Sequence, residues 1–89
     1  MDYEQFMTKC EAAAEALSHG RKVSLRQSDI ATWGVQPLLA EVKTQLSMIS
    51  HEECMDAPMT GGESYTFRLR LEATAGGGGR LVAKKVWHE

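Results

Sequence analysis

The spacing of apolar residues changes partway along this chain, and the change limits the folds open to it. From Tyr65 to Thr74 apolar and polar residues alternate strictly, five of each. A period of two is typical of a β-strand with one buried face. Four glycines follow at 76–79, and the chain then returns with an alternation that is irregular at Lys84 and Lys85. The pattern predicts a C-terminal β-hairpin with a mobile glycine turn and a bulge near those two lysines.

The first fifty residues show helical spacing instead, with apolar residues recurring every three or four positions in three stretches. Asp2 fits as the cap of the first helix and Gly20 as its stop. Residues 21–23 are long enough for a short strand. The second helix is predicted from a capping-box spacing that starts at Ser24, and it ends at Gly34.

The third helix is predicted over 37–50, with Gln36 as its cap and Pro37 in the first helical position. Residues 51–63 show no sustained period and contain Pro58 and paired glycines, which predicts a loop. The two periods together predict a core of eight apolar residues: Phe6, Leu17, Ile30, Val42, Leu46, Phe67, Leu69 and Leu71.

Length and composition fit a single globular domain, residues 1–89. The chain is 43% apolar and 25% charged, close to the averages for folded domains. It holds no run of about 20 apolar residues, the length a membrane span needs, and its acidic start does not resemble a secretion signal. We therefore expect a cytoplasmic protein that does not contact membranes, with Cys10 and Cys54 as free thiols.

The net charge of −2 argues against a generic polyanion binder, but the charges are unevenly distributed. Residues 1–19 and 51–63 are acidic, whereas 20–50 and 64–89 are basic. If folding brings the two basic segments together, the molecule has a basic surface that the net charge hides.

The order helix, short strand, helix, tight turn, helix, hairpin resembles the winged helix-turn-helix family of DNA-binding domains. The turn Trp33-Gly34-Val35 is similar to the family's turn, although Ile30 stands where the family prefers a small residue. The run from Ala12 to Arg21, followed by Ser24, also resembles the N-terminal DNA-binding domain of plasmid KfrA-type proteins. The expected fold is thus α+β and winged-helix-like, with three helices and a C-terminal β-hairpin.

This resemblance implies a non-enzymatic regulator that binds double-stranded DNA. It assigns helix 37–50 to the major groove and the hairpin to the backbone or minor groove. The third helix would present polar residues outward, among them Gln36, Lys43 and Thr44 for base edges and, against the prediction, the acidic Glu41. Basic residues of the hairpin suit phosphates: Arg68, Arg70, Arg80, Lys84 and Lys85. The alternative that these charges form an ordinary solvated sheet face stays open.

A second class of function also stays open. Small acidic α+β proteins of phages and mobile elements, such as anti-CRISPR proteins, bind a host defence complex and inhibit it. Methionines interleaved with carboxylates could contact a basic protein groove here, and the candidate residues are Glu52, Glu53, Met55, Asp56, Met59 and Glu63. A homodimer is a further alternative.

No catalytic residue, cofactor or metal site is expected. His51, Glu52, Glu53 and Cys54 place metal donors close together, but they lack the spacing of a structural zinc site. The glycine run is not followed by the Lys-Ser/Thr pair of a phosphate-binding loop.

Overall fold

The computed structural model describes residues 3–56 and 64–88, which form three helices and a three-stranded antiparallel sheet. The predicted class, α+β with three helices and a C-terminal hairpin, is confirmed. The cap expected at Asp2 lies outside the described residues. In chain order the elements are α1 (Tyr3–Ser18), β1 (Val23–Leu25), α2 (Gln27–Trp33), α3 (Val35–Asp56), β2 (Ser64–Ala73), a 3₁₀ turn (Ala75–Gly77) and β3 (Gly79–His88).

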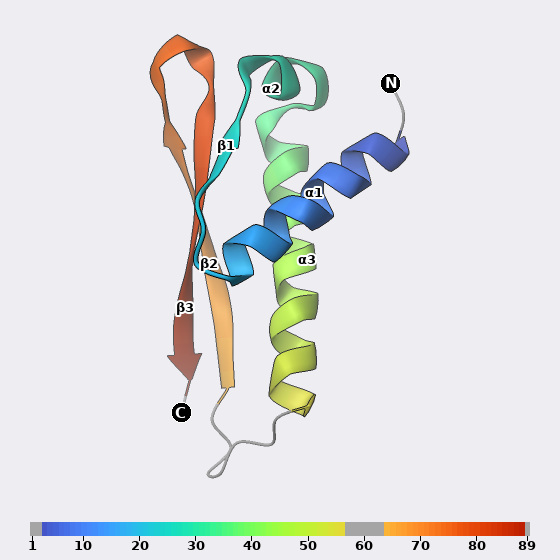
Figure 1. Ribbon diagram of the computed structural model, residues 1–89, viewed down its shortest axis with the longest axis vertical. Coiled ribbons are helices and arrows are strands. Elements are labelled where there is room, and N and C mark those ends of the chain that lie inside the picture. Colours follow the sequence, from blue (N-terminus) through green and yellow to red (C-terminus); the bar gives the residue numbers. More distant parts are fainter. Residues whose placement is uncertain (1–2, 57–63, 89) are drawn as a thin grey trace.

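The sheet has the order β1-β3-β2, so the strand that comes last in the chain is the central one (Figure 1). β2 and β3 pair in register from Ser64 opposite His88 to Ala73 opposite Gly79. The bulge predicted at Lys84 and Lys85 is therefore wrong, since each faces one residue of β2. The alternation looked irregular because Lys85 occupies a position on the inner face, where the pattern calls for an apolar residue.

The core lies between the helices and the inner face of the sheet. α1 crosses α3 (Figure 1), and Leu17, Leu46 and Leu81 are fully buried. Small residues of α1, Ala13 and Ala14, are buried in the same cluster. Leu17, Val42 and Leu46 of the predicted core are buried, and the other five pack against it partly buried: Phe6, Ile30, Phe67, Leu69 and Leu71. None of the helices described here is long and apolar enough to traverse a lipid bilayer.

Glycines end α1 and α2, as the sequence predicts. Gly20 and Gly34 have φ angles of 81° and 86°, a region that favours glycine. The Gly20 amide donates to the Leu17 carbonyl and the Gly34 amide to the Ile30 carbonyl. Both glycines therefore close the helix that precedes them.

The two following helices start elsewhere than predicted. The N-cap of α2 is Arg26, because Ser24 is held in β1 opposite Arg80. α3 begins at Val35, ahead of Pro37, because the Gly34 carbonyl already accepts a hydrogen bond from the Leu38 amide. A single glycine therefore joins α2 to α3.

α3 continues to Asp56, so the loop predicted from residue 51 is wrong for its first six residues. The buried stripe of this helix runs through Leu46 to Ser50, whose hydroxyl donates to the Ser47 carbonyl. That bond satisfies the polar group of Ser50 within its own helix. A serine at a core position interrupts the hydropathy pattern but not the helix.

The glycine-rich tip of the hairpin packs against the segment that leads into α2. A Cβ on Gly77 would lie 3.1 Å from Nε2 of Gln27, and one on Gly78 would lie 2.8 Å from the Leu25 carbonyl oxygen. The amide of Thr74 donates to the Gly78 carbonyl and closes the turn. The turn predicted as mobile thus packs closely against the segment that leads into α2, and this close packing requires glycine.

Gly34→Ala is expected to destabilise the fold by about 1–3 kcal/mol, because φ 86° and ψ 148° lie in a region open essentially to glycine alone. The added Cβ would also lie 3.3 Å from Cδ of Pro37. Urea unfolding measures the loss. The matched control is Gly20→Ala, which has a similar φ but nothing within 4 Å of the new Cβ. An equal loss in both variants would contradict the special role of the α2–α3 joint.

Candidate nucleic-acid interface

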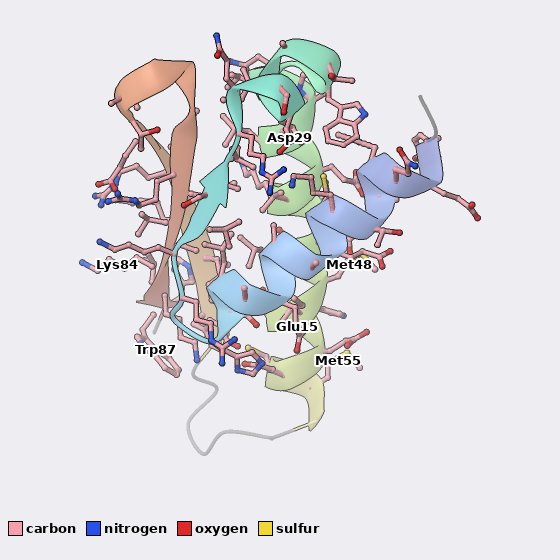
Figure 2. The ribbon with its side chains drawn as sticks, turned by 45° about the horizontal axis from the view of Figure 1, so that its top comes forward. Glu15, Asp29, Met48, Met55, Lys84 and Trp87 are labelled. Atoms are coloured by element: carbon pink, nitrogen blue, oxygen red, sulfur yellow. The ribbon has the colours of Figure 1, made fainter. Side chains whose placement is uncertain are left out.

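The outer face of the hairpin, turned away from the helices, carries four basic residues. In the register of β2 and β3, Arg68 lies opposite Lys84, Arg70 opposite Val82 and Glu72 opposite Arg80. All four basic side chains are exposed, and Figure 2 shows Lys84 projecting from the side of the sheet opposite the helices. We call this set the basic sheet face: Arg68, Arg70, Arg80 and Lys84.

Glu72 pairs with two of the four cations of the basic sheet face, Arg70 and Arg80. Its Oε2 lies 3.0 Å from Nη2 of Arg70, and its Oε1 lies 3.9 Å from Nη1 of Arg80. Within residues 3–56 and 64–88, Arg68 and Lys84 have no such ion pair although they face each other across the strands. Two like charges in opposite positions destabilise a sheet. A negatively charged ligand would relieve this repulsion.

Arg68 also connects the sheet to α3. A cavity of about 300 Å³ at the β2 edge is lined by Lys43 of α3, by Arg68, and by five further residues: Thr66, Phe67, Leu69, Val86 and His88. A second hollow, of about 460 Å³, is lined by Arg68 together with Arg70, Val82, Ala83 and Lys84. Arg68 belongs to both, so it links the hollow that Lys43 of α3 lines with the hollow that Lys84 of β3 lines. We call the first cavity the β2-edge groove.

Glu41 does not lie on the outer face of α3, where the sequence places it. It is half-buried, its carboxylate accepts a hydrogen bond from Nε2 of Gln45 at 3.0 Å, and it acts electrostatically on Cys10 of α1. The helix turns this carboxylate toward α1, away from β2. Gln36, Lys43 and Thr44 are exposed as predicted, and the Thr44 hydroxyl donates to the Ala40 carbonyl.

Lys85 is not part of the basic sheet face. Strands without a bulge send neighbouring residues to opposite faces, so Lys84 points outward and Lys85 inward. The Lys85 Nζ lies 4.6 Å from the centre of the Tyr65 ring, a cation–π contact. Its predicted role in nucleic-acid binding stays a prediction, and its position separates it from the four residues of the basic sheet face.

No protein-family model, curated protein or solved structure matches this chain.

Two residues of the β2-edge groove, Thr66 and His88, were not predicted from the sequence as site residues. The sequence contains a pattern that could have identified them, because the alternation that places Arg68 and Lys84 on the outer face of the hairpin also places Thr66 and His88 there. Oγ1 of Thr66 and Nε2 of His88 lie 2.9 Å apart and are hydrogen-bonded.

The described members of the acidic candidate set lie in the last two turns of α3 and line neither of these hollows. Glu52, Glu53 and Met55 are exposed there, and Asp56 is the final residue of the helix. The side chain of Asp56 and the whole of Met59 and Glu63 lie outside the described residues.

In the part of the chain that the structure describes, no group of three or more His, Cys, Asp or Glu side chains is placed to hold a metal ion. Cys10 and Cys54 are free thiols, as predicted. Burial raises the pKa of the Cys10 thiol from 9.0 to about 11; the nearby Glu41 carboxylate adds to this rise, and Lys9 opposes it.

This pKa predicts a stability that depends on pH. Between pH 9 and about 11 the unfolded chain loses the Cys10 proton while the folded chain keeps it, so the free energy of unfolding falls as pH rises through this window. Below pH 9 both the folded and the unfolded chain keep the Cys10 proton, so this thiol does not make the free energy of unfolding depend on pH. Urea unfolding of the natural chain and of Cys10→Ala at about pH 8 and about pH 10.5 should show the stability gap between them narrowing at high pH. A constant gap would contradict the shifted pKa.

Proposed function

We propose that this protein is a non-enzymatic regulator that binds double-stranded DNA through the basic sheet face and the exposed side of α3. One observation carries the proposal: Arg68 lines both the β2-edge groove with Lys43 and the hollow with Lys84, which joins helix and hairpin into one basic surface. A net charge of −2 would otherwise argue against a polyanion partner.

The separate parts of this surface suit different parts of a duplex. Arg68 and Lys84, which have no ion pair among the described residues, present cations to phosphates, which supply sequence-independent affinity. Gln36 and Thr44 present amide and hydroxyl groups, which can address base edges. The orientation of Glu41 toward α1 removes the carboxylate that would repel a duplex from this side of α3.

The element order supports the same proposal. A helix, a short strand, two helices joined by one glycine, and a hairpin is the order on which the winged-helix resemblance rests. The basic residues of the hairpin lie along its strands, since the tip at 74–79 has no charged residue. Phosphate contacts are therefore assigned to the strands rather than to the tip.

The test is titration of a short fluorescent duplex with the protein at salt concentrations from about 50 to 200 mM, read by anisotropy. The natural chain should bind with a dissociation constant below about 10⁻⁴ M at low salt, and Arg68→Ala should lower the salt slope by about one. Arg70→Ala and Arg80→Ala should have smaller effects, because Glu72 already engages both arginines. If no duplex is bound at low salt, the DNA proposal fails.

A further inference from the structure

A second exposed surface lies on the C-terminal half of α3. Met48 and Met55 are 53% and 68% exposed, and Glu52 is exposed between them. Positions 48, 52 and 55 are spaced by four and three residues, so they share one helix face. We call this set the methionine face: Met48, Glu52 and Met55.

The methionine face is separate from the buried side of α3, which carries Val42, Leu46 and Ser50. Single exposed apolar residues are ordinary on a protein surface. Two methionines aligned along one helix, about 10 Å apart at 1.5 Å per residue, form a row that a partner helix can match with two anchors one heptad apart. Methionine is flexible and polarizable, and such side chains adapt to the shape of a partner.

The surroundings of the methionine face are acidic. The segments 44–56 of α3 and 10–18 of α1 contain no lysine or arginine. Figure 2 shows Glu15 on the side of the molecule where α1 crosses α3, together with Met48 and Met55. Lys9 directly precedes the 10–18 segment, and its Nζ forms an ion pair with Oδ2 of Asp29 in α2 at 3.1 Å.

The acidic surroundings of the methionine face distinguish between two possible partners, a second copy of this chain and a basic protein. In a two-fold dimer the same patch meets itself, so Glu52 of each copy would face the carboxylates of the other. Like charges brought together across an interface oppose association. A partner with apolar anchors and surrounding lysines or arginines meets no such cost.

We propose that the methionine face binds a basic amphipathic helix of a partner protein. This goes beyond DNA binding and does not depend on it, because the basic sheet face and the methionine face share no residue. The partner is defined by its chemistry: apolar residues spaced as i and i+7 along one side, with cations around them.

The experiment titrates the full chain into two dye-labelled synthetic helical peptides of equal length, one built from leucine and lysine and the other from leucine and glutamate. The lysine peptide should bind saturably, with one peptide per chain, and the glutamate peptide should not. Met48→Gln and Met55→Gln should each weaken binding about tenfold, since each loses the burial of one methionine. Glu52→Lys should weaken it by a similar factor.

The matched control is Tyr3→Gln, which removes another exposed apolar side chain, 72% exposed, at the far end of α1. This variant should bind the lysine peptide as the natural chain does. Circular dichroism confirms that each variant is folded. The proposal is overturned if the methionine variants bind as tightly as the natural chain or if both peptides bind equally. Self-association that Met48→Gln abolishes would also overturn it, because the occupant would then be a second copy.

Discussion

Leu46→Ala is expected to lower the free energy of unfolding by about 2–5 kcal/mol. Leu46 is 1% exposed and belongs to the cluster in which α1, α3 and the sheet meet. Truncation would leave a cavity bordered by elements that hold one another in place. Small domains are stable by only about 5–15 kcal/mol, so this loss could unfold a large fraction of the chain. Urea or thermal unfolding measures it.

The matched control for this variant lies two residues along the same helix. Met48→Ala removes a side chain of similar size from an exposed position, and it should change stability by less than about 0.5 kcal/mol. Similar losses from both variants would show that α3 does not bury the face assigned to it.

Lys84→Glu is expected to weaken binding to duplex DNA by about 10- to 100-fold, uniformly across sequences. The range follows from losing one charge-assisted contact worth about 1.5–3 kcal/mol. The new carboxylate would also lie opposite Arg68 in the register and could pair with it, removing a second cation from the interface. Anisotropy titrations at several salt concentrations should show a reduced salt slope.

Lys85→Glu is the control for this prediction, because it makes the same change in charge at the next residue but on the opposite face. Binding should change by a small factor, through long-range charge alone, since the residue lies beside the Tyr65 ring. A loss equal to that of Lys84→Glu would show that net charge, rather than the basic sheet face, controls binding. The comparison therefore separates a defined surface from a general electrostatic effect.

The fold could be predicted from the sequence where one period dominates. The alternation from Tyr65 to Thr74 places Arg68 and Arg70 on the outer face, and glycine marks the ends of α1 and α2. Prediction failed where a polar residue occupies a buried position, as Ser50 does in α3. It also failed at Lys85, because a long side chain can rest on an aromatic ring and leave its charge exposed.

Less of the candidate interface could be predicted, because it depends on contacts between elements distant in sequence. The outward arginines follow from the strand period, but the cavity shared by Lys43 and Arg68 depends on how α3 lies along β2. The position of Glu41 was missed for the same reason. Helical spacing fixes its angle around the axis of α3 but does not say which side of that helix α1 covers.

The sheet order β1-β3-β2 affects how the chain folds during its synthesis. β1 and β2 leave the ribosome before β3, and neither can complete its backbone pairing until residues 79–88 have emerged from the exit tunnel. Until then the nascent chain exposes unpaired strand edges and the apolar side of β2, the features that recruit chaperones and favour aggregation. A chain that stops before residue 79 should therefore bind chaperones more strongly than a chain that carries β3.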